Sequence, residues 1–221
     1  LFRNCKELRL RRAAPRCPPV STEPLNPALC PHRLQQLDAS WVSGGITGAD
    51  IISGLAANLE CRSSLQRLSL NGLHLDWGSL PEDGRVRVGF SSLQGLRTLN
   101  LANTDLTDAA LEDICTLPQL ETLDISCTAV SKLTALLQCK NTLRSVIAHR
   151  LRQLDMSPTR LLSVLGQLHA LRHLDLSDDH LAMDDNDGRD GEELVQQLLE
   201  GSPQVLPSLI SLDISGRKRV T

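Results

Sequence analysis

The stretch LETLDI, residues 120–125, places apolar side chains at its first, fourth and sixth positions. In an extended chain, successive side chains point to opposite faces. Leu123 and Ile125 therefore share one face, and Thr122 and Asp124 share the other. The stretch predicts a short strand with a buried apolar side and an exposed polar side.

The same L-x-x-L-x-L pattern, with apolar substitutes, recurs along the chain. Its eight copies begin at Cys5, Leu34, Leu65, Leu96, Leu120, Leu143, Leu171 and Leu209. Successive starts lie 29, 31, 31, 24, 23, 28 and 38 residues apart, mostly in or near the leucine-rich-repeat period of about 20–29. We therefore expect residues 1–221 to form one α/β leucine-rich-repeat solenoid, with a curved parallel sheet on the concave face and helices and loops on the convex face.

The composition fits a core that reuses one side chain, because the chain has 44 leucines but only two Phe, two Trp and no Tyr. Between the strands, amphipathic patterns predict helices at residues 50–59, 108–116 (behind a Thr107 N-cap), 161–168 and 192–200. Three stretches break the rhythm and are expected to be irregular loops, namely the proline-rich 15–31, the Gly/Pro-containing 76–89 and the acidic 178–193.

Charge and cysteine content restrict the class of protein. A net charge of −3 argues against a nucleic-acid partner. No apolar run approaches the roughly 20 residues of a membrane helix, and the charged start excludes a secretory signal. The chain begins without methionine and its last motif stops abruptly at the end, so we expect a fragment of a longer protein.

The seven cysteines form no C-x-x-C pair, so they lack the usual spacing of zinc or thioredoxin-like sites. Cys30, Cys61 and Cys139 each lie four residues before a motif start, and Cys115 lies five before one. This recurrence predicts small core residues rather than reactive thiols. Free thiols packed in a core fit a reducing compartment, so we expect an intracellular protein of the cytoplasm or nucleus.

Polar side chains between the leucines are expected to point outward on the concave strand face, where they predict a candidate protein-binding face with a recurrent D-x-S pattern. Its residues are Asp38, Ser40, Asn71, Asn100, Asp124, Ser126, His149, His173, Asp175, Ser177, Asp213 and Ser215. Asp175 and Asp213 are expected to be neighbours that raise each other's pKa. The pattern is explained either as an acidic surface for a basic partner or as the way a repeat edge stays soluble. We prefer the second explanation for any single aspartate, and expect a partner somewhere on this face.

Catalytic and cofactor sites are not expected. His149 falls between Ser126 and Ser177, with aspartates nearby, but no G-x-S-x-G elbow is present. Aligning Gly188 with the glycine of an EF-hand loop puts Met183 and Leu194 where carboxylates are needed, so we expect no metal. No nucleotide-binding glycine motif occurs. Two basic clusters, Arg9/Arg11/Arg12 and Arg217/Lys218/Arg219, are either solvated solenoid ends or polyanion patches.

Several segments resemble the Zyg-eleven family, which includes the Zer-one proteins. They are DIISGL (50–55), LPQLETLDIS (117–126), TALLQCK (134–140), LRHLDLSDD (171–179) and LPSLISLDISGRKRVT (206–221). The order and spacing match from about residue 50 to the end; the irregular stretches 15–31, 76–89 and 178–193 depart from the pattern.

The resemblance implies a substrate-recognition subunit of a cullin-two RING ubiquitin ligase, which is not itself an enzyme. Such proteins carry an N-terminal elongin-binding box, leucine-rich repeats and a C-terminal armadillo-like array that recognises N-terminal glycine degrons. The present chain matches only the middle region, so no degron-binding residue is carried over. Elongins B and C and cullin-two are expected to bind outside it, together with substrate proteins. The alternative is a stand-alone leucine-rich-repeat module, a scaffold or inhibitor unrelated to ubiquitin.

Overall fold

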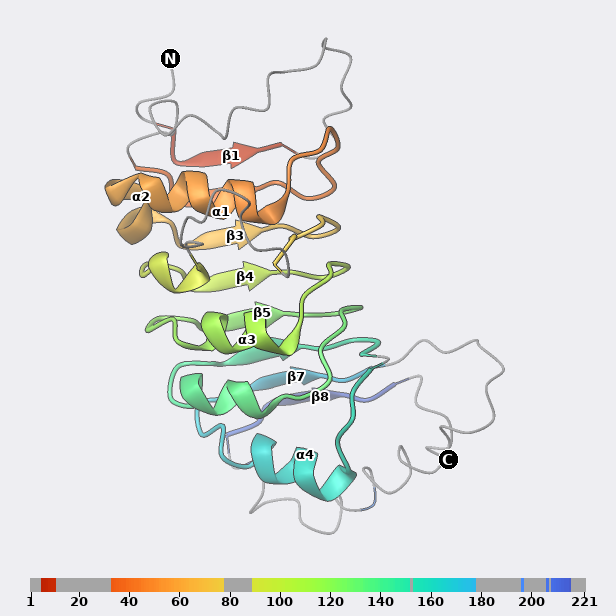
Figure 1. Ribbon diagram of the computed structural model, residues 1–221. Coiled ribbons are helices and arrows are strands. Elements are labelled where there is room, and N and C mark those ends of the chain that lie inside the picture. Colours follow the sequence, from red (N-terminus) through yellow and green to blue (C-terminus); the bar gives the residue numbers. More distant parts are fainter. Residues whose placement is uncertain are drawn as a thin grey trace.

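The computed structural model describes residues 5–10, 33–77, 89–151, 153–177, 196, 206 and 208–215. Its strands are β1 (Glu7–Arg9), β2 (Gln36–Asp38), β3 (Arg67–Ser69), β4 (Thr98–Asn100), β5 (Thr122–Asp124), β6 (Ser145–Ile147), β7 (His173–Asp175) and β8 (Ser211–Asp213). They form one parallel sheet whose order follows the chain, as Figure 1 shows. Each strand covers the third to fifth positions of one predicted motif, so the predicted parallel sheet is confirmed.

The strands are in register, so the fourth motif residues form a single column through the sheet. Leu123 pairs with Leu99 on one side and with Val146 on the other. These three side chains are fully buried, whereas Leu212 in β8 is 37% exposed. Residues in the middle of the column are covered by a column neighbour on each side. Leu212, at the β8 end, has such a neighbour on one side only.

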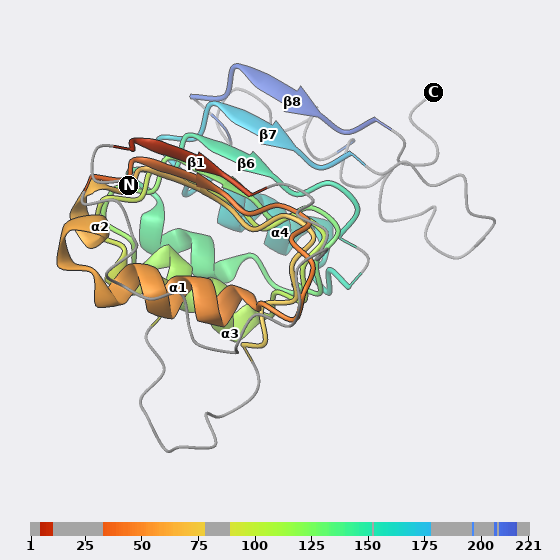
Figure 2. The same ribbon diagram turned by 90° about the horizontal axis from the view of Figure 1, so that it is seen from above.

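The return segments between strands form short helices. They are α1 (Gly48–Ala57), α2 (Leu59–Ser64), η2 (Phe90–Ser92), α3 (Asp108–Cys115), η3 (Thr134–Cys139) and α4 (Pro158–Leu165). Figure 2 shows the labelled α-helices on one side of the sheet. The apolar core lies between the two layers and is built mainly from leucines. The result is a solenoid-like α/β fold.

Helix starts are set by capping residues. α1 begins before the predicted start at residue 50, because Thr47 and Asp50 form a reciprocal capping box in which each side chain accepts the other's backbone N–H. α4 begins before the predicted residue 161, because the Ser157 hydroxyl accepts the backbone N–H of Arg160. Thr107 precedes α3 as predicted, but its side chain makes no capping hydrogen bond. The 3₁₀ segments η2 and η3 were not predicted.

The described return-segment cysteines are core residues, as predicted. Cys61, Cys115 and Cys139 are 0%, 1% and 3% exposed. The hydrogen bond with the Cys139 thiol, together with burial, raises the pKa of Cys115. A thiol that stays protonated is a poor nucleophile, so Cys115 packs the core without being activated. The same hydrogen bond lowers the pKa of Cys139, whose side chain is nonetheless buried in the core.

A backbone ladder continues past the strand ends. The residue three positions after the strands β2 to β6 has a left-handed backbone, at Trp41, Gly72, Asn103, Cys127 and Arg150, with φ values of 57°, 71°, 57°, 56° and 54°. Each of these N–H groups donates to the next repeat, as from Cys127 to the His149 carbonyl at 2.8 Å. Only the second of the five is glycine, the residue that tolerates this conformation best. Neighbouring repeats are therefore joined at the turns as well as at the strands.

Some predictions fall on residues outside those described. These are the loops at 15–31 and 178–193, most of the helix at 192–200, Cys17, Cys30, Arg11, Arg12 and the basic cluster at 217–219. Arg9 of the first basic cluster is described and pairs with Glu7. Of the stretch 76–89, Trp77 packs its ring on Phe90, with 4.9 Å between ring centroids. Within the described residues, no helix has the length and apolar character needed to cross a membrane.

Candidate functional site

The labelled α-helices leave one face of the sheet open (Figure 2), and the predicted polar residues lie in or just after its strands. In β2, β4, β5 and β6 the middle residue is buried and its two neighbours are half-buried. Asp38, Asn100, Asp124, Asp175 and Asp213 are the last residues of their strands, and His173 is the first residue of β7. Ser40, Asn71, Ser126, His149, Ser177 and Ser215 follow their strands by two residues. The structure thus brings the predicted residues together along one edge of the open face, apart from His173 at the other.

The recurrent D-x-S pattern has a local structural cause. Asp124 Oδ1 accepts the backbone N–H of Ser126 at 3.0 Å, and the same bond joins Asp175 to Ser177 at 2.9 Å. Asp38 and Asp213 repeat it, and Asn100 uses its amide oxygen in the same way. The side chain holds the turn that follows the strand. Sequence reasoning treated these residues as a surface and missed this role, which the fixed spacing of two could have indicated.

The predicted mutual pKa increase of the neighbouring carboxylates is wrong for Asp213. Asp175 and Asp213 are register partners, as expected. However, hydrogen bonds from the backbone and side chain of Ser215, with a smaller contribution from the charge of His149, hold the pKa of Asp213 below its ordinary value. A carboxylate that accepts N–H and O–H donors is stabilised in its charged form.

His149 lies in a chain of hydrogen bonds beyond the strand ends. Its backbone N–H donates to Ser126 Oγ at 3.2 Å, and its Nδ1 lies 3.0 Å from Ser177 Oγ. The Ser177 hydroxyl donates to Asp175 Oδ1 at 2.5 Å. Serine stands between histidine and aspartate, whereas a nucleophilic triad needs histidine between the other two. The arrangement orients side chains and does not activate the serine.

Burial divides the predicted face residues into two groups. Ser40, Ser126 and Ser177 are each only 7% exposed, so they support the turns and offer little surface to a partner. His173, Asp213 and Ser215 are exposed. The accessible part of the face is therefore formed by strand residues more than by the serines that follow them.

The first four strands form a shallow polar hollow on the same face. It is lined by the outward side chains of β1 to β4, among them Arg9, Asp38 and Arg67. Ser69 Oγ lies 2.8 Å from Ser40 Oγ at its edge. Acidic and basic groups alternate here, so the hollow does not select one sign of charge.

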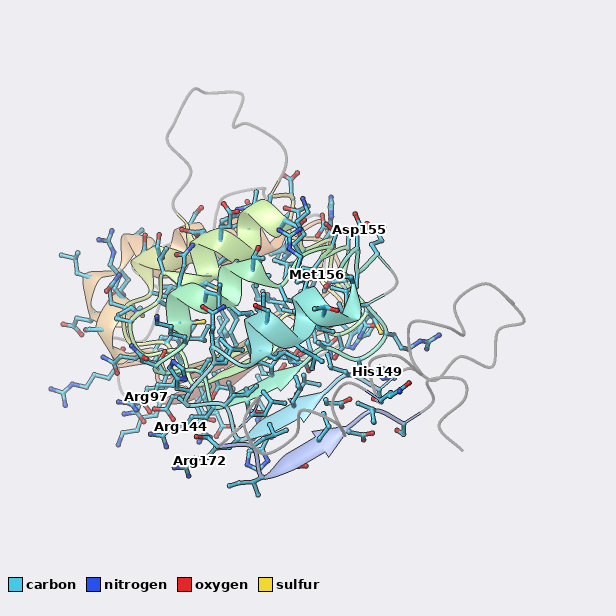
Figure 3. The ribbon with its side chains drawn as sticks, turned by 90° about the horizontal axis from the view of Figure 1, so that it is seen from below. Arg97, Arg144, His149, Asp155, Met156 and Arg172 are labelled. Atoms are coloured by element: carbon cyan, nitrogen blue, oxygen red, sulfur yellow. The ribbon has the colours of Figure 1, made fainter. Side chains whose placement is uncertain are left out.

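Sequence reasoning missed a row of charged residues at the opposite edge of the face. Arg97, Arg144 and Arg172 immediately precede β4, β6 and β7, and Glu121 precedes β5. Figure 3 shows the three arginines together near the strand starts and His149 beyond the strand ends. Arg97 forms an ion pair with Glu121 at 2.6 Å. All four residues occupy the second position of the L-x-x-L-x-L motif, and this shared position could have identified them. They were missed because each lies a whole repeat away from the next in the sequence.

Metal chemistry finds no support in the described part of the chain, where no three His, Cys, Asp or Glu side chains are grouped to hold an ion. The sequence matches none of the known protein-family models. The possible function is therefore argued from the geometry of the site. The open sheet face carries aspartates at the edge where the strands end and charged residues, mainly arginines, at the edge where they begin.

Proposed function

We propose that the chain is a leucine-rich-repeat solenoid whose open sheet face binds proteins, within a substrate-recognition subunit of a cullin-two RING ubiquitin ligase. The repeat segment contributes no chemistry of its own. It holds a substrate protein at a fixed place relative to the ligase subunits, and so supplies proximity for ubiquitin transfer by other subunits.

The observation that carries the binding role is the continuity of the open face across eight in-register strands. At about 4.8 Å per strand, the face is roughly 34 Å long. With about 17 Å along each motif, its area is about 600 Å², of the same order as the roughly 800 Å² that one partner contributes to a stable interface. The backbone hydrogen bonds of the inner strands are used within the sheet, so the outward side chains are the groups available to a partner.

The ubiquitin-ligase role is supported by the Zyg-eleven resemblance. The quoted segments contain β5, β7 and β8 together with η3, so they include sheet-forming parts of the fold. An intracellular location is supported by the buried free thiols of Cys61, Cys115 and Cys139. Elongins B and C and cullin-two are the partners that this role requires.

Two rival functions make different demands. A stand-alone repeat module would bind its partner through the same face without elongins or cullin-two. An enzyme would need an accessible nucleophile, and the geometry at Ser177 disfavours one because its hydroxyl donates to Asp175 and is nearly buried.

Affinity purification of the full-length tagged protein from cells, followed by mass spectrometry, tests the proposal. We expect elongins B and C and cullin-two together with substrate proteins. Recovery of open-face partners without those ligase subunits would favour the stand-alone module.

A matched pair of variants tests which face binds. Thr122→Arg adds a large cation to the open face at half-buried Thr122 of β5, and Glu112→Arg adds one to exposed Glu112 of α3. We expect substrate proteins to be lost with Thr122→Arg and kept with Glu112→Arg. The opposite pattern would refute binding through the sheet.

A further inference from the structure

The strongest unexplained feature is the pair formed by Arg144 and Arg172. The backbone N–H of Arg172 donates to the carbonyl of Arg144 at 2.8 Å, so the two residues are adjacent across β6 and β7. Both are exposed. Like charges on neighbouring strands repel each other, and the sheet keeps them side by side.

This pair has no acidic partner among the described residues. Arg97 is neutralised by Glu121, but no ion pair within the described chain involves Arg144 or Arg172. The nearest aspartate on the same strand, Asp175, lies three residues on, about 10 Å along an extended chain. It is occupied with the N–H and hydroxyl of Ser177. Among the described residues the two arginines are therefore left without an ion pair, because Glu121, on the strand next to Arg144, pairs with Arg97 instead.

We infer that Arg144 and Arg172 bind an acidic helix of a partner protein, with carboxylates one turn apart. This inference rests on the proposed protein-binding function and names the chemistry of the partner. Arginine binds carboxylates through two parallel hydrogen bonds.

The spacing favours a helix over an extended segment. Neighbouring strands place the arginines about 4.8 Å apart. Side chains at i and i+4 of a helix lie about 5–6 Å apart, whereas same-side residues of a strand lie about 6.6 Å apart.

The next residues along the edge set the order of charges in the partner. Beyond Arg144 comes Glu121, whose backbone carbonyl accepts the N–H of Arg144 at 2.7 Å. A partner helix that crosses the strands meets Arg172, Arg144 and Glu121 in turn. Two acidic residues followed by a basic one, each one turn further on, complement this order, and the basic residue shares the Glu121 carboxylate with Arg97. A nucleic-acid backbone does not, because it meets Glu121 and the aspartates of the other edge with like charge.

The test is fluorescence anisotropy with a labelled alanine-based helical peptide that carries Glu, Glu and Lys at i, i+4 and i+8. We expect the full chain to bind it and the double variant Arg144→Gln/Arg172→Gln to bind at least about tenfold more weakly. Arg160→Gln on α4, where Arg160 is also exposed, is the matched control and should bind as the native chain does. Far-UV circular dichroism checks that each variant is folded.

Charge reversal separates direct contact from general attraction. Arg144→Glu/Arg172→Glu should bind the peptide in which Lys replaces both Glu and reject the original. Failure of that exchange would overturn the inference, as would equal binding of a peptide with its Glu residues on opposite faces or of a single-stranded oligonucleotide. No detectable binding of the Glu, Glu, Lys peptide would overturn it too. If the double Gln variant still recovers substrate proteins from cells, the scaffold role stands and the arginine site does not.

Discussion

Removal of a leucine from the middle of the sheet column should cost far more than removal of its counterpart in β8. Leu123 is 0% exposed, so Leu123→Ala loses about three buried carbon groups, worth about 2.4 kcal/mol. The enclosed cavity adds to this, for a total of about 3–5 kcal/mol. Leu212 occupies the same motif position but is 37% exposed. Leu212→Ala should cost about 1–1.5 kcal/mol, because less area is lost and the space opens to solvent.

Urea titration followed by far-UV circular dichroism measures this difference. With a slope of about 3 kcal/mol per molar urea, Leu123→Ala should lower the midpoint by about 1 M or more. Leu59→Ala, at a side chain that is 73% exposed, controls for substitution at the surface and should leave the midpoint almost unchanged. Equal losses in Leu123→Ala and Leu212→Ala would refute the idea that burial in the column sets the cost.

Three further substitutions test the packing and the turns. A Cβ on Gly95 would lie 2.1 Å from the Ser63 carbonyl oxygen, so Gly95→Ala should destabilise the fold by about 3 kcal/mol. The loss should appear as a fall in melting temperature, and an unchanged melting temperature would contradict it. Arg150 has a left-handed backbone with φ 54°, which glycine tolerates and a β-branched residue does not. Arg150→Val should therefore be less stable than Arg150→Gly by about 1–3 kcal/mol in urea titrations. Equal midpoints would argue against backbone strain at Arg150. Burial raises the pKa of Asp108, but hydrogen bonds from Ser131 and the following residue outweigh it and leave that pKa below its ordinary value. A lowered folded-state pKa gives stability that is present above the unfolded pKa and lost as pH falls through the folded one. Asp108→Asn should therefore cost about 1.5–3 kcal/mol at pH 7 in urea titrations, and much less at a pH below both pKa values. A cost independent of pH would refute this.

The strands could be predicted from the sequence because the apolar period determines them. Leu123 and Ile125 share a face in any extended chain, and the same pattern recurs at each strand. The helix boundaries were less accurate, since they depend on capping bonds of single residues such as Thr47 and Ser157. The apolar pattern predicts which residues of a return segment are buried, but it does not predict the residue at which the helix begins.

The candidate site was predicted in position but not in role. The D-x-S residues lie where the pattern put them, yet their main contacts are to their own turns. Trp41, Cys127 and Arg150 gave no sign of a left-handed backbone, because none is a residue type that favours it. Arg144 and Arg172 become neighbours only when the register is known, and the sequence separates them by a whole repeat.

The order of the sheet, with each strand bonded only to its neighbours in the chain, has a mechanical consequence. A force applied to the two ends pulls across the strands and loads one interface at a time, as in opening a zipper. Resistance should be low and rupture should occur in steps. Each step releases one repeat of 23 to 38 residues, or about 80–130 Å of chain at about 3.5 Å per residue. An unfolding motor that grips one end would therefore dismantle this protein repeat by repeat, with the remaining strands still in place.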